Sequence, residues 1–250
     1  FRFLAPPGGL TQREWWASIK LARATLTKPL PMSDAQRRPF VIASPDALQR
    51  ALSEADRDLS GRVEVPSQLN TPGVRDRYLI SALIEEAITS SQLEGASTTR
   101  KIAKEMLRSG RKPRDKSKRM IFNNFHAMEF VRSIAGKPIT PELILAVHRH
   151  VTDGTLDDPQ DAGRLRTTDD VGVYAPDGTL LHTPPPAHQL KPRLKAFCAF
   201  ANAESAAQPF IHPIVRATLL HFFRGYDHPV VDGNGRTARA LFYWSMLHSR

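Results

Sequence analysis

The chain has 250 residues, of which 41% are hydrophobic and 24% are charged, and its formal net charge at pH 7 is +10. This composition is typical of a globular protein with a buried core and excludes the fibrous and disordered classes. The single Cys198 excludes an internal disulfide framework, and no apolar run reaches the roughly 18 to 20 residues of a membrane helix. The sequence shows no charged head followed by an apolar core, which is the pattern of a signal peptide, so we expect a reducing, cytoplasmic location.

Much of the positive charge lies in RSGRKPRDKSKR, residues 108–119, where a glycine and a proline interrupt any helix. Clustered lysine and arginine bind polyanions through counterion release. No aromatic residue lies among these charges to stack on a nucleic-acid base. We therefore interpret the stretch as a solvated connector and keep nucleic acid or an acidic protein surface as the less favoured alternative.

In chain order, the first seventy residues predict helices separated by proline-rich breaks. Over residues 74–93, apolar residues recur at steps of three and four, which predicts a helix that ends at Gly95. A second helix is expected to begin near residues 97–99, whose hydroxyl groups suit an N-cap, and to end at Gly110, in the favoured position just past a helix end.

The remainder of the chain predicts further helices with one hairpin among them. Helical patterns cover residues 120–134, 139–152, 188–203 and 212–224. VGVY and TLLH flank the turn signal Asp177-Gly178, which predicts a β-hairpin. His148 falls on the apolar face of its helix, and we interpret it as a packed, hydrogen-bonded core histidine rather than a ligand. The predicted fold class is all-α, mainly helical, with one small β-hairpin and an additional N-terminal helical region.

The stretch HPVVDGNGRTAR, residues 228–239, resembles a turn, because Asp-Gly and Asn-Gly are common in hairpins. The sequence after Gly235 argues against a hairpin, since RTARALFYWSML has no strand alternation and an almost continuous apolar run that predicts a buried helix. A glycine-rich loop before a helix N-terminus is an anion site, because free N–H groups and the helix dipole favour negative charge. Gly233 and Gly235 also lack the Cβ atoms that would keep a phosphate from the backbone.

Four charged or titratable side chains accompany this loop. Arg236 and Arg239 are three residues apart, so both project from one side of the first helical turn toward the same anion. Asp232 would repel a bare anion, but it fits a site in which Mg²⁺ or Mn²⁺ bridges it to phosphate oxygens. His228 can accept a proton near neutral pH. Together they predict phosphoryl or nucleotidyl transfer to a hydroxyl, and the loop is not a P-loop because no Gly-Lys-Ser/Thr follows the glycines.

HPVVDGNGRTAR closely resembles the signature of the Fic (filamentation-induced-by-cAMP) family, His-Pro-Phe-x-Asp/Glu-Gly-Asn-Gly-Arg-x-x-Arg. The one departure is Val230 where the family prefers phenylalanine, which concerns packing rather than chemistry. The preceding HPIVRATLLHFF resembles the helix that leads to the family motif, and AGRLRTT with the hairpin ending HTPPPA resembles the family's flap. The resemblance covers roughly residues 120–250 and implies the helical Fic fold.

The resemblance implies that the chain transfers AMP from ATP to a Ser, Thr or Tyr hydroxyl of a target protein. His228 would deprotonate the hydroxyl, and Asp232 would hold the metal. The ATP phosphates would be held by backbone N–H groups and arginines of the motif, namely Gly233, Asn234, Gly235, Arg236 at the β-phosphate and Arg239 at the γ-phosphate. The flap would align the target by strand addition, through Val171, Gly172, Val173, Leu181, His182 and Thr183.

SSQLEG, residues 90–95, would by itself indicate only a helix end with an exposed glutamate. It also resembles the family's inhibitory motif Ser/Thr-x-x-x-Glu-Gly/Asn, at Ser90, Glu94 and Gly95. The resemblance implies that Glu94 pairs with Arg239 in the place of the γ-phosphate, so that ATP binds in an unreactive pose. In some family members the same glutamate positions a water that removes AMP, and this reverse reaction stays an alternative.

We expect two regions. Residues 1–110 form an N-terminal helical region that includes the inhibitory helix, about 74–95, and residues 111–250 form the catalytic core, cut short at its C-terminal end. The expected partners are ATP and an unidentified target protein, for which the chain itself is one candidate, without a membrane. The alternatives are a non-catalytic regulatory or nucleic-acid-binding protein on a Fic scaffold and a Fic enzyme with another nucleotide donor. Whether Glu94 acts within one chain or across an oligomer is open.

Overall fold

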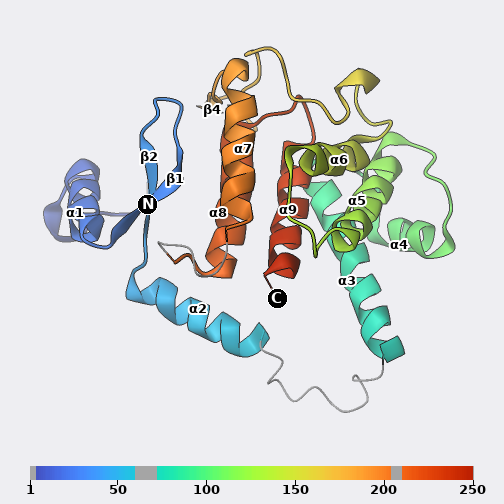
Figure 1. Cartoon of the computed structure of the whole chain (residues 1–250), viewed down its shortest axis with the longest axis horizontal. Coiled ribbons are helices and arrows are strands. Elements are labelled where there is room, and N and C mark those ends of the chain that lie inside the picture. Colours follow the sequence, from blue (N-terminus) through green and yellow to red (C-terminus); the bar gives the residue numbers. More distant parts are fainter. Residues whose placement is uncertain (1–3, 60–71, 204–209, 250) are drawn as a thin grey trace. The chain divides into compact units, whose positions relative to one another are not determined.

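The computed structural model describes residues 4–59, 72–203 and 210–249. The chain forms two compact units, Phe1–Val65 and Pro66–Arg250. The described part of the first unit contains α1 (Gln12–Ala24), β1 (Thr27–Ser33), β2 (Pro39–Ala43) and α2 (Asp46–Leu59). That of the second contains α3 (Pro72–Leu93), α4 (Arg100–Ser109), α5 (Lys116–Ser133), α6 (Pro141–Thr152), β3 (Val173–Tyr174), β4 (Leu180–His182), α7 (Leu190–Ala201), α8 (Pro213–Asp227) and α9 (Asn234–His248). The predicted, mainly helical architecture is confirmed (Figure 1).

The first unit contains a hairpin where the sequence pattern predicts only helices and proline-rich breaks. Strands β1 and β2 pair antiparallel, with Pro29 opposite Val41. In the sequence the prolines of KPLP indicate breaks between helices, yet they are compatible with this hairpin, because the outer edge of a two-stranded sheet requires no N–H donor. The predicted boundary at residue 110, between an N-terminal helical region and a catalytic core, stays a prediction.

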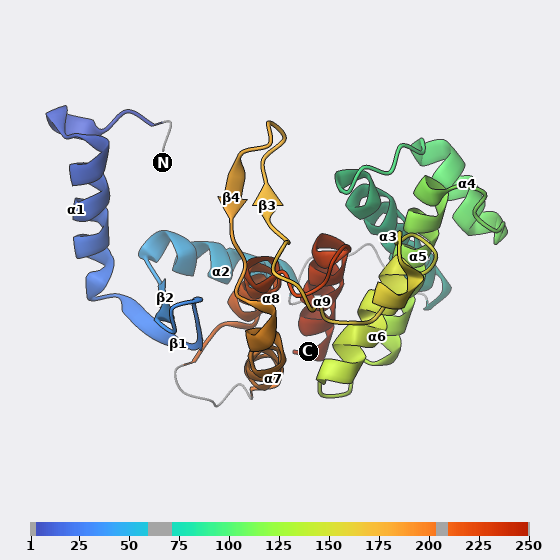
Figure 2. The same ribbon diagram turned by 90° about the horizontal axis from the view of Figure 1, so that it is seen from above.

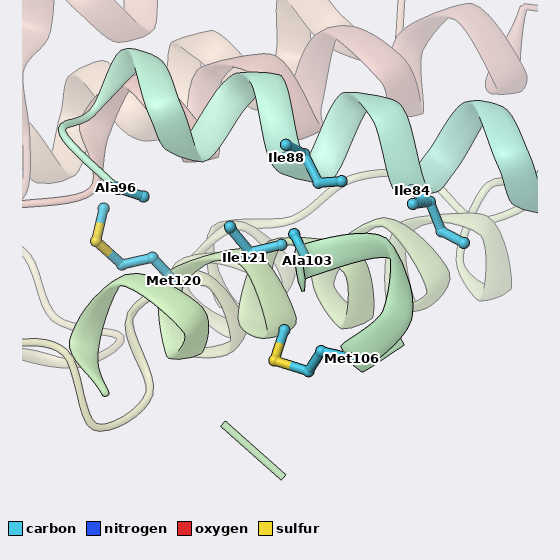
Figure 3. Close-up of a cluster of buried hydrophobic side chains, with 7 residues drawn as sticks. All are labelled: Ile84, Ile88, Ala96, Ala103, Met106, Met120 and Ile121. Atoms are coloured by element: carbon cyan, nitrogen blue, oxygen red, sulfur yellow. The ribbon is translucent and has the colours of Figure 1, made fainter. Parts of the chain in front are cut away.

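The second unit is built around α3, α5, α6 and α9, which pack on one another. Figure 3 shows the side chains that join α3, α4 and α5, which are Ile84, Ile88, Ala96, Ala103, Met106, Met120 and Ile121. Ala96 lies in the turn between α3 and α4 and is 6% exposed. Burial of this turn places the residues just before it, including Glu94, at a defined position beside the core.

The helix ends follow the local signals in the sequence. Thr99 accepts a hydrogen bond from the Ile102 N–H as N-cap of α4, and Gly110 ends that helix with a φ of 65°. Thr140 caps α6 in the same way. A hydroxyl at the N-cap satisfies an otherwise unpaired N–H, and glycine adopts the left-handed conformation without steric cost. These predictions of helix boundaries are confirmed.

Helices α8 and α9 lie side by side, and the loop between them carries the motif (Figure 1). The predicted hairpin is confirmed as β3 and β4, which pair antiparallel with Val173 opposite His182. Figure 2 shows the hairpin projecting away from the helices of the second unit. Within the described ranges, no helix combines the length and the apolar character needed to cross a membrane.

The basic stretch 108–119 runs from the end of α4 to the start of α5. Several of its charges lie next to carboxylates. Arg111 lies 3.1 Å from Glu105, and Lys118 lies 2.6 Å from Asp115, the N-cap of α5. Side chains such as Arg111, which is 71% exposed, remain in contact with solvent.

Candidate active site

The motif loop begins with a strained residue. His228 follows α8 as its C-cap and has φ 40° and ψ 56°, a left-handed conformation that non-glycine residues adopt at a cost of about 1 to 3 kcal/mol. Its backbone N–H donates to the Arg224 carbonyl at 3.1 Å, so this conformation ends the helix. Such strain persists only where surrounding contacts hold the backbone.

The loop is held by side chains within the motif. The Asn234 carboxamide accepts from the Val230 N–H at 3.2 Å and donates to the Val230 carbonyl at 2.7 Å. Val230 itself is fully buried, so the smaller side chain still serves as an apolar contact where the family signature has phenylalanine. Asn234 therefore fixes the turn through its side chain, while its backbone N–H lies in the first turn of α9.

Helix α9 begins directly after the loop, so a helix rather than a second strand follows the glycines. Its N-cap is Gly233, with a φ of 82° and no side-chain cap. The first N–H groups of α9 therefore lack the side-chain partner that usually satisfies them, and they combine with the positive end of the helix dipole. A Cβ at Gly233 would lie 2.6 Å from Cγ2 of Thr152, so close packing on α6 also requires glycine.

His148 of α6 supports the loop from beneath. Its Nδ1 accepts from the Gly163 N–H at 3.0 Å, and its Nε2 donates to the Asp232 carbonyl at 2.8 Å. The side chain is fully buried, and burial lowers its pKa to about 4, so the ring is neutral at pH 7. The interpretation of His148 as a packed, hydrogen-bonded core histidine is confirmed, and its contacts add a role in holding the loop.

The His228 imidazole is set up to accept a proton. Burial, followed by the positive charges of Arg224 and Arg166, lowers the pKa of His228 below its ordinary value of 6.5. A long hydrogen bond of 3.4 Å joins Nδ1 to the Gly225 carbonyl, which places the proton on Nδ1 and the lone pair on Nε2. A neutral ring with a free lone pair is the form that a general base requires.

Asp232 and Arg236 flank the start of α9. The Asp232 side chain is 54% exposed, and its Oδ2 lies 3.6 Å from Nη2 of Arg236. Arg236 is 1% exposed and donates from Nη1 to the Val151 carbonyl at 3.1 Å. Burial lowers the pKa of Arg236, and the negative charge of Asp232 opposes that shift. Among the described residues, no group of three or more His, Cys, Asp or Glu side chains forms a metal site.

The fold brings SSQLEG to the same end of α9. Arg239 donates from Nη2 to Oε1 of Glu94 at 2.6 Å and from Nε to Oγ of Ser90 at 2.6 Å. Nη2 also donates to the Ser90 carbonyl at 3.1 Å. The exposed fractions of the two charged side chains are 19% for Arg239 and 29% for Glu94, so the pair is partly shielded from solvent.

Glycines let Glu94 reach this position. Gly95 ends α3 with a φ of 91°, and the Gly95 N–H donates to the Gln92 carbonyl at 3.0 Å. Gly235 lies beneath the Glu94 carboxylate, because a Cβ at Gly235 would overlap Oε1 of Glu94. A carboxylate thus rests over the N-terminus of α9, in the environment that the helix dipole makes favourable for an oxyanion.

Two side chains of the hairpin segment contact α8 and the motif. His182 of β4 joins its Nε2 to the Tyr226 carbonyl at 2.7 Å, so this ring faces α8. Arg166, which no sequence pattern marks as a site residue, is 4% exposed and donates from Nε to the His228 carbonyl at 3.0 Å. The remaining flap residues named from the sequence lie half-buried or exposed, and Leu181 is 65% exposed. A single buried arginine leaves no periodic pattern in the sequence, so only the resemblance of AGRLRTT to the family's flap indicated this region.

The second unit is thus a helical structure in which a glycine-rich loop with a histidine at its start leads into a buried helix that carries an arginine pair in its first turns. Residues 138–246 match the Fic/DOC family, and this part of the chain is a Fic domain.

Curated relatives carry the same domain. The chain is 35% identical over 118 residues to the protein adenylyltransferase Fic of Nematostella vectensis, and the matching region covers 46% of this chain and 25% of that protein. It is 40% identical over 106 residues to the protein adenylyltransferase fic-1 of Caenorhabditis elegans, and this match covers 42% of this chain and 19% of that protein. The matching region thus spans a quarter or less of the length of these relatives.

Solved structures show the same fold. A Fic-domain-containing signalling protein from Bacteroides thetaiotaomicron VPI-5482 superimposes with a TM-score of 0.63 at 20% identity, covering 80% of this chain and 72% of that chain. Fic-1 from C. elegans superimposes with a TM-score of 0.63 at 25% identity, covering 82% of this chain and 58% of that chain.

Proposed function

We propose that the chain transfers AMP from ATP to a hydroxyl group of a target protein, and that Glu94 holds this activity low. The observation that carries the proposal is the Glu94 carboxylate over Gly235 and against Arg239. This contact supports an oxyanion site at the N-terminus of α9, a few residues from a neutral His228. The names of the relatives as protein adenylyltransferases support the choice of reaction.

In the proposed reaction, a Ser, Thr or Tyr hydroxyl of the target attacks the α-phosphate of ATP. The new bond joins the hydroxyl oxygen to the α-phosphorus, the bond to the bridging oxygen of the β-phosphate breaks, and pyrophosphate leaves. The hydroxyl proton passes to Nε2 of His228. The lowered pKa of His228 supports this role, because the ring is neutral and ready to accept a proton at pH 7.

The phosphates are proposed to lie on the first turn of α9. The backbone N–H groups of Gly233, Asn234 and Gly235 would face the α- and β-phosphates, with Arg236 at the β-phosphate. Arg239 would bind the γ-phosphate through its guanidinium, which matches phosphate oxygens in a bidentate manner. Since Glu94 engages Nη2 of Arg239, the γ-phosphate and the Glu94 carboxylate compete for one cation.

A divalent cation fits the chemistry of this loop. Mg²⁺ is usually held by one or two carboxylates together with substrate phosphates and water, and Asp232 is a single, 54% exposed carboxylate at the proposed phosphate site. Asp232 would hold Mg²⁺ or Mn²⁺, and the ion would neutralise charge on the departing pyrophosphate. The nearby Arg236, 3.6 Å from Asp232, already offsets part of the carboxylate charge.

The ion pair between Glu94 and Arg239, which is the proposed brake on AMP transfer, has an energy large enough to lower the reaction rate. An exposed ion pair is worth about 0 to 1 kcal/mol, whereas breaking a buried pair costs about 3 to 5 kcal/mol. The Glu94–Arg239 pair is partly shielded and is joined by Ser90, so it falls between these limits. At about 1.4 kcal/mol per factor of ten, an intermediate value corresponds to a reduction in rate of about one to two orders of magnitude.

A mass measurement tests the proposed function. Glu94→Gly protein is incubated with Mg²⁺ and ATP, alone and with a cell lysate, and proteins that gain the mass of one AMP are identified by mass spectrometry. Parallel incubations with UTP, GTP and CTP identify the donor. An added phosphate instead of AMP, or no added mass on any protein with any donor, would contradict the proposal. Loss of AMP from a premodified target by the unmutated chain would instead reveal the reverse reaction.

A further inference from the structure

Arg166 lies at the point where the two ends of the hairpin segment meet. Its side chain is 1% exposed, and Nη1 donates to the Thr168 carbonyl at 2.6 Å, ahead of β3. Nη2 donates to the Pro185 carbonyl at 2.5 Å, behind β4. Asp169 closes the arrangement, because its Oδ1 lies 3.1 Å from Nη1 of Arg166 and accepts from the Ala187 N–H at 2.6 Å. One guanidinium thus joins the entry and the exit of the hairpin.

The same guanidinium holds the backbone of the proposed general base. Nε of the Arg166 side chain donates to the His228 carbonyl at 3.0 Å. The backbone N–H of Arg166 also donates to the Pro229 carbonyl at 3.0 Å. These two carbonyls belong to the residue with φ 40° and to its successor. Because the Cα–Cβ direction follows the backbone, contacts that hold the His228 carbonyl also set the direction of the imidazole.

We propose that Arg166 is a positioning residue that links the seating of the hairpin to the orientation of the His228 ring. The proposal rests on the proposed function, in which the hairpin aligns the target and His228 takes its proton. A target segment held by the hairpin would then meet the imidazole at a fixed separation, because both are fastened to one buried side chain. Proton transfer needs the acceptor nitrogen within hydrogen-bond reach of the hydroxyl, so this separation decides the rate.

The contact between His182 and Tyr226 does not replace this link. It fastens β4 to the last turn of α8 through the Tyr226 carbonyl, and it reaches neither the entry of the hairpin nor the His228 carbonyl. Only a planar fork with donors on three nitrogens satisfies the Thr168, Pro185 and His228 carbonyls together. Lysine carries a single ammonium group on a flexible stem, so Arg166→Lys keeps the charge and loses the geometry.

The test compares Arg166→Lys with Arg216→Lys in a Glu94→Gly background. Arg216 is a matched control, because it is also buried, at 8% exposed, and donates to the Phe200 and Ala203 carbonyls, which lie outside the motif. Four quantities are measured, which are thermal stability, ATP affinity by calorimetry with Mg²⁺, the rate of AMP transfer, and the histidine ring signals in NMR spectra of side-chain-labelled protein. The His228 signal is assigned by its loss in His228→Ala.

We expect both variants to lose thermal stability and to keep ATP affinity within about twofold of the background protein. Arg166→Lys alone should shift and broaden the His228 signal, and it should lower AMP transfer by about 10- to 100-fold, the size expected for a misplaced reacting group. An unchanged His228 signal in Arg166→Lys overturns the proposal. An equal shift in Arg216→Lys overturns it as well, because the effect would then be structural. Absence of AMP transfer in the background protein refutes the proposed function, whereas the NMR comparison still decides the role of Arg166.

Discussion

Oε1 of Glu94 lies 2.6 Å from Nη2 of Arg239, although the two residues are 145 positions apart in the chain. The pair joins the end of α3 to the first turns of α9, and the Glu94 carboxylate rests where the helix dipole favours an anion. We predict that Glu94→Gly raises AMP transfer by about 10- to 100-fold, since release of Arg239 is worth about 1.4 to 2.8 kcal/mol. Initial rates with Mg²⁺ and ATP measure the change. Asp157→Gly, which removes an exposed loop carboxylate, is the control, and equal rates for Glu94→Gly and the parent would refute the brake.

Ser90 contributes a smaller part of the same restraint. Its buried Oγ accepts from Nε of the charged Arg239 guanidinium at 2.6 Å, and a hydrogen bond to a charged group is worth about 1.5 to 3 kcal/mol. Ser90→Ala loses only part of this energy, because the backbone carbonyl of residue 90 still accepts from Nη2 of Arg239. We expect Ser90→Ala to raise AMP transfer by about 2- to 10-fold, less than Glu94→Gly. Ser91→Ala is matched to it, because Ser91 is a buried serine of the same helix that donates to the Met120 carbonyl instead. Equal activation by both variants would show that loosening of α3, rather than the contact with Arg239, releases the proposed activity.

Removal of the proposed base should separate chemistry from binding. His228→Ala in the Glu94→Gly background is expected to lower AMP transfer by at least about 100-fold, the lower end of the range for general bases. ATP affinity, measured by calorimetry, should stay near that of the background protein, because the phosphates are proposed to lie on α9. His126→Ala, on the exposed face of α5, is the control. Retention of more than a tenth of the activity would remove His228 from the proposed mechanism.

The pH profile follows from the environment of His228. Burial lowers the pKa of His228 below 6.5, so the neutral, proton-accepting ring predominates at pH 6.5 and is lost only as the pH falls through the lowered pKa. In Glu94→Gly, we expect kcat/KM for ATP to fall toward acid pH with the midpoint of the fall below pH 6.5, since this parameter reports the free enzyme. An acid limb with its midpoint above 6.5 would show that another group controls the rate.

Close packing of the motif loop on α6 gives a stability prediction. Gly233→Ala places a Cβ at φ 82° and 2.6 Å from Cγ2 of Thr152, and we expect it to lower the free energy of unfolding by about 2 to 4 kcal/mol. Thr152→Ser removes that methyl group and keeps the hydroxyl that donates to the His148 carbonyl at 2.8 Å.

The double variant should therefore recover part of the loss, about 1 kcal/mol, while the cost of the left-handed backbone remains. Urea unfolding of the two single variants and the double variant measures this coupling. Strict additivity of the two single changes would show that the contact with Thr152 does not limit the residue at this position.

Local signals in the sequence predict much of this protein. Thr99 and Thr140 cap their helices, Gly110 ends α4, and the sequence after Gly235 forms a buried helix, all as expected. Each of these outcomes depends on contacts within a few residues, such as a hydroxyl that meets an N–H three positions on. The hairpin at residues 27–43 lies beyond such signals, because its prolines suit both a break and an unpaired strand edge.

By itself, then, the sequence determined the helices, their ends and the order of chemical groups in HPVVDGNGRTAR, since short-range geometry governs all three. Only the tertiary structure decided which distant groups meet there. Packing of α3 on α5 and α9 places Glu94 at Arg239, His148 holds the Asp232 carbonyl from α6, and Arg166 fastens the hairpin to His228. These contacts join residues 62 to 145 positions apart. The resemblance of SSQLEG to a family motif implied the Glu94–Arg239 pair, whereas no local pattern indicates the contacts of His148 and Arg166 with the motif loop, because they depend on how distant segments fit together.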